Sequence, residues 1–405
     1  MVANHRSPVG RQHASPPTDS VAAAGLAALE YAARREYTGW DYADGMSSRL
    51  RQALPFNNRW VNLAFQETIK RSPVNVRPLF LVEQRRNFKG TALFTLAHRE
   101  FDRTSLDGDS FDHAHEATRL ADWLLDNQCP GYSGFCGGHR HENQHLDHRT
   151  LPTEPDVVST SYGVKALLAA AEYDPEYADV ARTAEAFLLE DMHYREVEDG
   201  AKIDYYPKDT ADHYTLNAGA LAARTLVDLY AHVGDDPLRE RARKLLDYVV
   251  ARQTDSGGWY YRDPPDASHL SMDTHHNGFV IECLQRYREV TDSRRYDETL
   301  NRAVEFFQDA LFEADGAPRF DESTAYPRDV HAAAQGILVF TYAGDLQFAR
   351  RIIDWTLEHL YAGDGRFYVQ KRRFYTKRIT LMRWCQAWMA YALAVYCRSA
   401  EAGGE

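Results

Sequence analysis

The chain has 405 residues, of which 44% are hydrophobic and 26% are charged, and its formal net charge is −12 at neutral pH. This composition supplies a large core and excludes the basic surface of a nucleic-acid-binding protein. No apolar run reaches the ~18 residues that cross a membrane, and the five cysteines do not suggest a disulfide framework, so we expect a soluble cytoplasmic protein with at most peripheral membrane contact.

The amino-terminal residues 1–19 are rich in Pro, Ser and His and poor in large hydrophobic residues, which predicts a disordered tail. A single domain is expected over residues 20–400. The first part of this domain is irregular, with helices expected near residues 20–35, 60–71 and 90–103. Residues 111–128 then form an amphipathic pattern with one apolar face.

Two kinds of helix alternate over the rest of the chain. Residues 237–253 carry a single apolar stripe, whereas residues 216–230, 330–342 and 384–396 are apolar on nearly every side. A helix that is apolar all round must be buried, and a striped helix can cover it from outside. Six Gly-aromatic hairpins separate the pairs, centred near residues 40, 134, 203, 259, 318 and 367. We therefore predict an all-α fold, an (α/α)6 toroid with short β-hairpin loops at one mouth. The alternative is an open helical solenoid.

The polar residues of this pattern gather at the starts of the buried helices. If those helices run parallel, their amino ends meet at one mouth of the barrel and present unpaired N–H groups that favour an anion. Acids and histidines at these positions are the catalytic candidates: Asp273, His276, Asp329, His331 and His213. Aromatic rings stack on sugar C–H faces, and Arg or Lys pairs with carboxylate or phosphate. The substrate-binding candidates are Trp40, Asp156, Trp259, Tyr260, Arg328, Lys377, Arg383 and Trp384.

Each of these residues also has a purely structural explanation. Asp273 and Asp329 occupy positions where Asp commonly caps a helix. His275 and His276 are adjacent on a helix, so we expect only one of them to face inward. The aromatic residues of the hairpins could serve loop packing alone. An acid and a histidine follow a Gly-aromatic hairpin in two successive units, and this repetition favours function.

Two further segments carry concentrated polar chemistry. Residues 371–378 hold five basic residues, which fits either a solvated hairpin or recognition of a uronate, a sugar nucleotide or a lipid-linked phosphate. Residues 129–148 contain two cysteines and four histidines, but their C-x6-C spacing is wider than that of a zinc knuckle. We favour a His-rich loop over the barrel mouth and predict no metal or other cofactor, with zinc as the alternative.

Two resemblances to known families follow from these motifs. Gln253, Gly257 and Trp259 match the QW signature of terpenoid cyclases and protein prenyltransferases, although the DxDD acid run and an obvious zinc triad are missing. The hairpin followed by Asp329–Gln335 resembles the six-hairpin glycosidase superfamily, with its unsaturated glucuronyl hydrolases, sugar 2-epimerases and glucuronyl C5-epimerases. More narrowly, Tyr326–His331 and the excess of Arg over Lys resemble proteins of haloarchaeal S-layer N-glycosylation.

The resemblance to the S-layer N-glycosylation proteins implies an enzyme of glycan biosynthesis. Its substrate would be an anionic sugar, a hexuronic acid, free or carried as a sugar nucleotide or lipid-linked oligosaccharide. Isomerisation or epimerisation would use paired histidines, for which His213, His276 and His331 are available. The alternatives are glycoside hydrolysis with Asp156, Asp273 or Asp329, a terpenoid-cyclase-like activity, and a non-catalytic glycan-binding protein.

Overall fold

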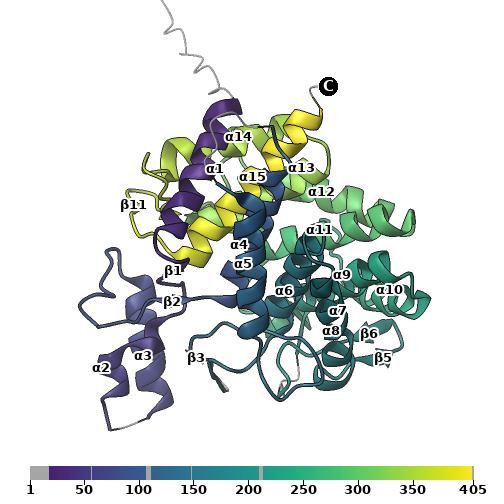
Figure 1. Cartoon of the computed structure of the whole chain (residues 1–405), viewed down its shortest axis with the longest axis horizontal. Helices are drawn as coiled ribbons and strands as arrows, with labels where there is room; N and C mark the ends of the chain where they lie inside the picture. Colours follow the sequence, from purple (N-terminus) through teal and green to yellow (C-terminus); the bar gives the residue numbers. More distant parts are fainter. Residues whose placement is uncertain (1–17, 56, 106–110, 147, 209–212, 404–405) are drawn as a thin grey trace, which may run out of the picture.

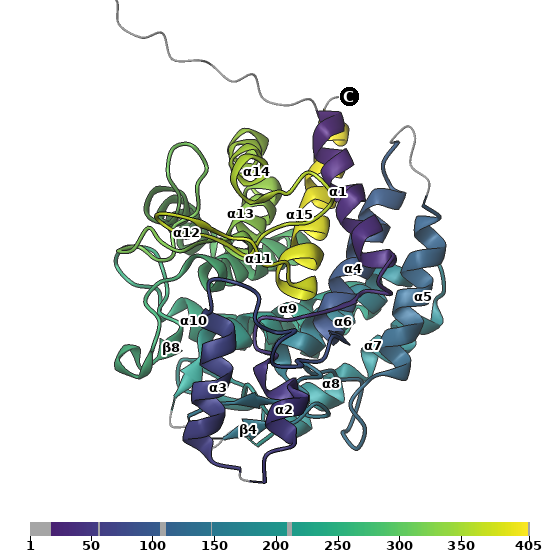
Figure 2. The same ribbon diagram turned by 90° about the vertical axis from the view of Figure 1, so that its left-hand side faces the viewer.

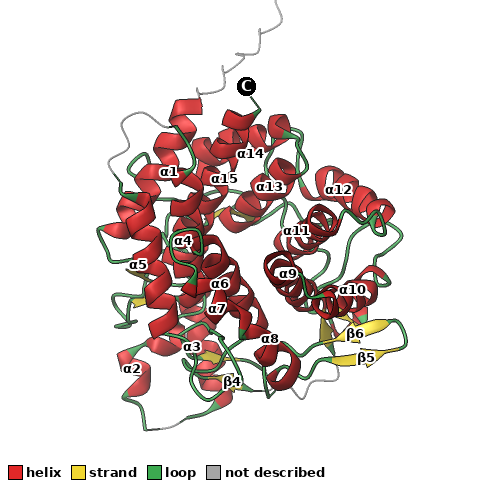
Figure 3. Ribbon diagram, turned by 45° about the vertical axis from the view of Figure 1, so that its right-hand side comes forward, coloured by secondary structure: helices red, strands yellow, loops and turns green. Residues whose placement is uncertain are grey.

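The computed structural model describes residues 18–55, 57–105, 111–146, 148–208 and 213–403, so the predicted tail lies almost wholly outside the described residues. Long helices dominate, and the strands are only two or three residues long (Figures 1 and 3). Within the described ranges, none of the helices combines the length and the hydropathy that a membrane crossing requires. All five cysteines are free and buried.

Six inner helices form a closed ring. They are α4 (Phe88–Asp102), α6 (Val157–Ala170), α9 (Leu216–Val233), α11 (Thr274–Thr291), α13 (Val330–Tyr342) and α15 (Trp388–Ala402). Each packs against the next, and α15 packs against α4. The predicted (α/α)6 toroid is therefore confirmed, and the open solenoid is excluded.

An outer helix covers each position of the ring. The outer helices are α1 (Thr18–Ala33), α5 (His113–Asp126), the broken helix α7 (Glu176–Arg182), α8 (Ala184–Ala186) and η2 (Phe187–Asp191), then α10 (Asp236–Val250), α12 (Asp297–Leu311) and α14 (Leu346–Leu360). In α10 the buried side chains recur on one stripe while the intervening charged residues face outward. This division explains why striped and fully apolar helices alternate along the sequence.

The Gly-aromatic segments are tight turns that lock each unit to the next outer helix. Gly257 has φ +102°, and a Cβ there would lie 2.6 Å from the carbonyl oxygen of Arg302 in α12. Gly365 has φ +85°, and its Cβ would lie 2.2 Å from the carbonyl oxygen of Ala27 in α1. Only glycine fits at such positions, and the second contact joins the last unit to the first.

The paired strands are short antiparallel links between loops. The pairs are β1 (Thr38–Gly39) with β2 (Arg85–Arg86), β3 (Asn143–Gln144) with β4 (Arg149–Thr150), β5 (Arg195–Val197) with β6 (Gly200–Lys202), and β7 (Tyr214–Thr215) with β8 (Arg262–Asp263). A three-stranded sheet joins β9 (Arg328–Asp329), β10 (Gln370–Lys371) and β11 (Thr376–Lys377). Pairing between loops of successive units, as in β7–β8 and β9–β10, ties the mouth together.

The irregular region near the amino terminus is an insertion between the first outer helix and its inner partner. It contains η1 (Gly45–Ser47), α2 (Arg49–Gln52) and α3 (Arg59–Arg71). A further short turn, η3 (Pro265–Ala267), lies outside the insertion, after β8. In Figures 1 and 2, α2 and α3 lie side by side next to the ring instead of within it. The inner partner of α1 is thus α4.

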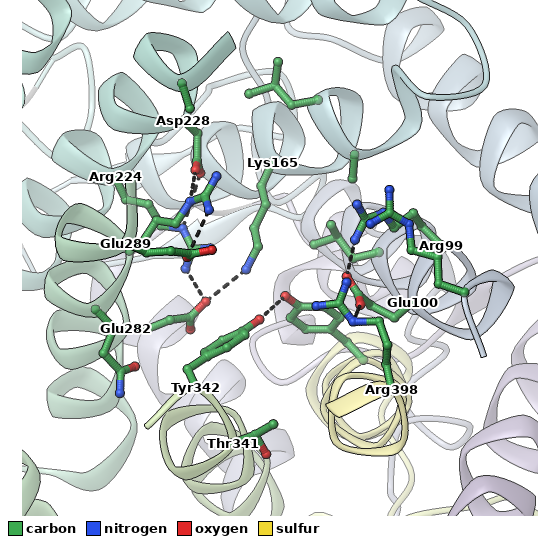
Figure 4. A pocket seen from close by; sticks show the side chains of 18 of the residues that line it. Arg99, Glu100, Lys165, Arg224, Asp228, Glu282, Glu289, Thr341, Tyr342 and Arg398 are labelled. Atoms are coloured by element: carbon green, nitrogen blue, oxygen red, sulfur yellow. Dashed lines mark hydrogen bonds and ion pairs between the residues drawn. The ribbon is translucent and has the colours of Figure 1, made fainter. Parts of the chain in front are cut away.

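The barrel has two chemically different ends. One cavity contacts the first turns of the inner helices, with Lys89, Asn217 and His275 among its lining residues. A second cavity contacts their last turns, with Arg99, Asp228 and Arg288 among its lining residues (Figure 4). The inner helices therefore run parallel, as the sequence predicted. Aromatic rings from α6, α11 and α15 meet across the axis between the two ends, where the centroids of Tyr162 and Trp388 are 5.2 Å apart and those of Phe279 and Trp388 are 5.7 Å apart.

Candidate active site in the barrel mouth

The cavity at the amino ends of the inner helices has a volume of about 610 Å³, a size that suits a small ligand. Its lining combines charged, histidine and aromatic side chains. These include Asp41, Tyr42, Lys70, Arg71, Lys89, His139, His141, Tyr205, Asn217, His269, His275, His276, Phe279, Arg319, Asp329, His331, Gln370, Arg372, Arg383 and Trp384. Six basic and two acidic residues in this set give the mouth a positive excess on an acidic chain.

One wall of the cavity is a histidine pair held by a buried carboxylate. Asp273 caps α11 by accepting from the His276 backbone N–H at 3.1 Å. Its two oxygens lie 3.0 Å from Nδ1 of His275 and 2.7 Å from Nδ1 of His276. Both Nε2 atoms are thus left for a ligand. Both histidines line the cavity, so the expectation that only one would face inward is wrong, because the first helical turn lets both rings reach back to the cap.

The environment fixes the charge state of this group. Burial lowers the pKa of His276 to about 4, although the Asp273 carboxylate raises it. Burial acts to raise the pKa of Asp273, but His276 and His275 outweigh it and hold that pKa below its usual range. At neutral pH Asp273 is therefore a carboxylate, and His276 is a neutral imidazole whose Nε2 can accept a proton.

His331 stands next to this pair, on α13. Its ring centroid is 5.0 Å from that of His275, and it stacks on Trp388 at 4.3 Å. The side chain is 1% exposed, and neither ring nitrogen has a hydrogen-bond partner within the part of the chain that the structure describes. Burial holds its pKa well below the ordinary value. A buried polar ring without partners normally costs stability, so its presence in a cavity suggests that a ligand completes it.

Asp329 positions its neighbours from the cap of α13. One oxygen accepts from the His331 backbone N–H at 2.9 Å and from the Trp384 indole at 2.8 Å, and the other accepts from the Gln370 amide at 2.8 Å. Burial raises the pKa of Asp329, against the pull of these three donors. The carboxylate thereby holds Trp384 in place at the edge of the His331 ring, 4.5 Å between centroids.

The opposite wall carries a buried lysine. Lys89 lies in the first turn of α4, across the ring from α11, and is 5% exposed. Its ammonium lies 5.8 Å from the Tyr162 ring and 5.9 Å from the Trp388 ring. No described residue accepts a hydrogen bond from it. Burial, with Arg383 adding to the effect, lowers the pKa of Lys89 to about 7. This amine is available to an anionic group of a ligand.

Two histidines of the loop before α6 complete this side. His139 lies 3.8 Å from the carboxylate of Asp156, which caps α6 through the Ser159 backbone N–H at 2.7 Å. His141 contacts the Ser47 hydroxyl of the insertion at 2.9 Å, and burial lowers its pKa to about 4. The His-rich loop predicted from the sequence therefore reaches the mouth.

Arg383 and Asp41 neutralise each other at the cavity wall. Arg383 makes two hydrogen bonds to the Asp41 carboxylate, at 2.8 and 2.7 Å. Burial opposes ionisation of Asp41, but Arg383 holds its pKa below the usual range. Beside this pair, Tyr42 and Trp384 stack with centroids 4.3 Å apart. The stack provides an aromatic surface at the rim.

The structure brings together a subset of the residues predicted from sequence. His276, Asp329, His331, Arg383 and Trp384 line the cavity, and Asp273 and Asp156 hold histidines that do. His213 does not line the cavity. It contributes to lowering the pKa of the cavity residue His269, although burial and the charge of Arg262 lower that pKa more.

The other predicted binding residues have structural environments instead. Trp259 is 2% exposed, and its indole donates to the Val249 carbonyl at 2.8 Å. The Trp40 indole donates to the Val82 carbonyl at 3.2 Å, and Lys377 donates to the Lys70 carbonyl at 2.6 Å. Arg328 lies 3.5 Å from Glu313, and Tyr260 packs against the core. None of these five lines the cavity.

Several cavity residues were missed from the sequence. Lys89 could have been found because it is the one charge in the otherwise apolar run from Phe88 to Ala97. Arg372 belongs to the basic run 371–378 that the sequence analysis marked as a candidate anion site, whereas Lys70 and Arg71 reach the mouth only because the insertion folds beside it. No local sequence signal announces that contact.

The residues with metal-ligand geometry are not those of the Cys-His loop. Among the described residues, one group of three offers donor atoms within 4.8 Å of one another, Asp273, His275 and His276. Both Asp273 oxygens already serve His Nδ1 atoms, which explains the arrangement without an ion. Cys129 and Cys136 are free and buried, and the Cys136 thiol donates a hydrogen bond to the Cys129 backbone carbonyl.

No protein-family model matches the sequence, and comparison with curated proteins finds no match. Solved structures do match. Cellobiose 2-epimerase from Bacillus thermoamylovorans B4167 superposes with a TM-score of 0.61 at 15% identity, covering 78% of this chain and 88% of that one. An unsaturated glucuronyl hydrolase specific for heparin gives 0.60 at 14%, covering 96% and 98%. A D-mannose isomerase gives 0.56 at 12%, covering 77% and 86%.

These likenesses show that the chain has the fold shared by six-hairpin glycosidases and sugar epimerases. The fold places the mouth cavity where parallel helix starts converge.

Proposed function

We propose that the protein is a sugar isomerase or epimerase that moves a proton on the carbon next to a carbonyl group of an anionic sugar. The observation that carries this proposal is the cluster of His275, His276 and His331 beside the Asp273 carboxylate, in which burial lowers the pKa of His276 and of His331 and keeps both rings neutral. The fold is also that of sugar epimerases, an isomerase and glycoside hydrolases. Proton transfer by a positioned imidazole is the chemistry that this cluster supports.

The proton path follows from the hydrogen bonds. Because Asp273 holds Nδ1–H of His276, Nε2 takes the proton from the carbon next to the sugar carbonyl. The carbonyl oxygen takes a proton from the N–H of His331, and an enediol results. His276 then returns its proton to the former carbonyl carbon while the neighbouring hydroxyl gives its proton back to His331. Atoms and charge balance, and the product is the isomeric ketose or aldose.

The wall that carries the histidines favours isomerisation over epimerisation. His276 and His331 come from adjacent inner helices, so both can act from one face of a planar enediol. Epimerisation needs a proton delivered to the opposite face, where Lys89 and His139 are the available carriers. The same cavity can therefore support both reactions, with the first requiring fewer groups.

In this proposal the Lys89 ammonium binds the negatively charged carboxylate of the sugar. Arg383 is neutralised by Asp41, and Arg328 and Lys377 lie outside the cavity. The ammonium of Lys89 faces the same space, has no ion pair with any residue that the structure describes, and lies within electrostatic reach of His276 and His331. A hexuronate carboxylate on Lys89 would hold the open-chain sugar across the cavity.

The narrower resemblance to the AglQ type of haloarchaeal S-layer N-glycosylation protein supports a hexuronic acid of a glycan precursor as this substrate. The proton path above needs the free acid, whose open chain carries a carbonyl group. In a sugar nucleotide or a lipid-linked oligosaccharide the anomeric carbon is bonded, and the exchangeable proton is the one next to the carboxylate. Mass spectrometry of lipid-linked and protein-linked glycans from a deletion strain tests this assignment. Loss or alteration of one hexuronic acid is expected, and an unchanged glycan would rule it out.

The reaction itself is tested with hexuronic acids in deuterated water, followed by proton NMR. The protein should wash deuterium into the position next to the carbonyl, and His276→Gln should abolish the exchange. No exchange with any free hexuronic acid would rule out the proposed isomerisation. Exchange without a change of product would indicate that reprotonation returns to the starting carbon.

Glycoside hydrolysis is the second candidate, and two observations favour it. The glucuronyl hydrolase covers nearly the whole of both chains, and burial raises the pKa of Asp329, as a proton donor requires. If the protein releases sugar from an unsaturated glucuronyl glycoside, and Asp329→Asn abolishes that release, hydrolysis is the correct function. A polyprenyl substrate suits the cavity less, because its lining is charged rather than dry. A glycan-binding protein would not need the Asp273-held histidines.

A further inference from the structure

We propose that the rim of the mouth is a surface that docks on an anionic lipid bilayer. The surface, here the mouth collar, consists of residues 49–55, 57–82 and 371–378. It contains α2, α3, the segment that follows α3, and the β10–β11 hairpin. Three of its basic residues, Lys70, Arg71 and Arg372, line the cavity, so the collar borders the site where substrate enters.

The collar concentrates positive charge on an acidic protein. It has eleven basic residues and a single acidic one, Glu67, while the whole chain carries −12. Arg51, Arg77 and Lys377 are buried, and the other eight basic residues reach the surface. A surplus of this kind attracts an anionic membrane, each basic residue near the surface adding to the attraction.

The collar also exposes most of the large apolar side chains that are open to solvent. Of the thirteen such residues among those described, nine belong to it: Leu50, Leu54, Trp60, Val61, Val74, Leu79, Leu81, Phe374 and Tyr375. Two more, Leu146 and Leu151, lie in a loop that Arg59 contacts through the Leu146 carbonyl at 2.8 Å. Phe374 is 88% exposed and Leu79 74%. Exposed apolar side chains gathered in one region mark an interaction surface.

Direct contacts join the parts of the collar. Lys377 of the hairpin donates to the Lys70 carbonyl at the end of α3, at 2.6 Å. Phe65 of α3 and Phe80 meet edge to face at 5.3 Å, which fastens the segment after α3 to that helix. Figures 1 and 2 show α2 and α3 beside the ring and outside it.

The order of residues favours a bilayer over a protein partner. Apolar and basic residues interleave in Arg49-Leu50-Arg51, Arg59-Trp60-Val61 and Arg373-Phe374-Tyr375. Aromatic rings that enter the boundary between headgroups and acyl chains, flanked by Arg at headgroup level, are the pattern of an interfacial anchor. Docking would face the mouth toward the membrane. The docking does not depend on the reaction.

The test is flotation of the full chain with vesicles of phosphatidylcholine containing about one-third phosphatidylglycerol, against phosphatidylcholine alone. Binding to the anionic vesicles should be about tenfold stronger and should weaken with added salt. The double variant Trp60→Ser/Phe374→Ser and the single variant Arg373→Glu should each reduce binding about tenfold. The matched controls are Val197→Ser and Arg294→Glu, exposed residues outside the collar, and they should bind like the parent.

Three results would overturn the inference. One is absence of binding to anionic vesicles at low salt. Another is equal loss of binding in the collar and control variants. The third is a dimer in solution that Trp60→Ser/Phe374→Ser dissociates, since the collar would then be an interface between two copies. Because none of these readouts uses the reaction, a failure here is separate from a failure of the proposed activity.

Discussion

The two ends of the barrel are both polar and hollow, yet their charges are used differently. The cavity at the carboxyl ends of the inner helices is the larger, about 840 Å³ against about 610 Å³ at the mouth. Its lining includes seven basic side chains and four acidic ones. Size and charge alone would make it the better candidate for a binding site.

The contacts at the carboxyl end show that its charges satisfy one another (Figure 4). Glu282 accepts from Lys165 at 2.9 Å and also from Arg224. Asp228 accepts from Arg286 at 2.6 Å. Arg398 and Glu100 are 2.8 Å apart. Basic residues there also face the negative ends of the helix dipoles, so this arrangement stabilises the fold without any ligand.

At the mouth, the same physics works in the opposite direction. Basic side chains there add to the positive amino ends of the helices, and Lys89 and His331 have no hydrogen-bond partners among the described residues. Such an arrangement is unfavourable in the free protein and favourable once an anion binds. Charges at the carboxyl end thus stabilise the barrel by pairing with one another, whereas charges at the mouth are available to a substrate.

The largest expected effect is on catalysis at the mouth. Asp273→Asn keeps a side chain that can cap α11 but removes the charge that holds His275 and His276. If the proton path is correct, kcat should fall about 10³–10⁴-fold, or about 4–5.5 kcal/mol in barrier height. The unfolding free energy should change by less than about 1 kcal/mol.

A matched control is Asp345→Asn, which alters the cap of the outer helix α14, where Asp345 accepts from the Phe348 backbone N–H at 2.9 Å. It should leave kcat unchanged. Equal loss of activity in both variants would show that Asp273 acts only through the stability of its helix.

The next effect is on stability at the carboxyl end. Glu282→Gln leaves Lys165 and Arg224 facing one another without their shared carboxylate, which should lower the unfolding free energy by about 3 kcal/mol. Denaturant titration measures the change. Glu289→Gln, at a 69% exposed residue that pairs with Arg286, should change the unfolding free energy by less than about 1 kcal/mol. A normal stability for Glu282→Gln, with lost activity, would reverse our assignment of the two ends.

A third effect concerns pH and Lys89. Burial lowers the pKa of this amine to about 7, so the ammonium that binds a carboxylate is present below pH 7 and is lost as the pH rises. KM for an anionic sugar should therefore increase about tenfold for each pH unit above 7. In Lys89→Arg this increase should vanish because the guanidinium stays charged. A rise that persists in Lys89→Arg would place the titrating group elsewhere.

The sequence predicted the ring because helix periodicity and Gly turns are local signals. Striped and fully apolar helices alternate, and glycines such as Gly365 sit where a Cβ would clash with the next outer helix. Candidates at helix starts, such as His276, Asp329 and Arg383, followed from the same pattern. Lys89 was missed because a single buried charge becomes meaningful only when its surroundings are known. The insertion that brings Lys70 to the mouth depends on contacts between distant segments.

The smallest expected effect concerns Trp259, and it tests whether this residue stabilises the fold or binds the sugar. The Gly-aromatic pattern predicted it as a stacking surface, but its ring is buried and its indole donates to the Val249 carbonyl. Trp259→Phe removes that hydrogen bond and should lower the unfolding free energy by about 1 kcal/mol while leaving KM unchanged. Trp384→Phe, at the cavity, removes the bond to Asp329 and should raise KM. A raised KM in Trp259→Phe with normal stability would mean that the turns between helices also touch the substrate.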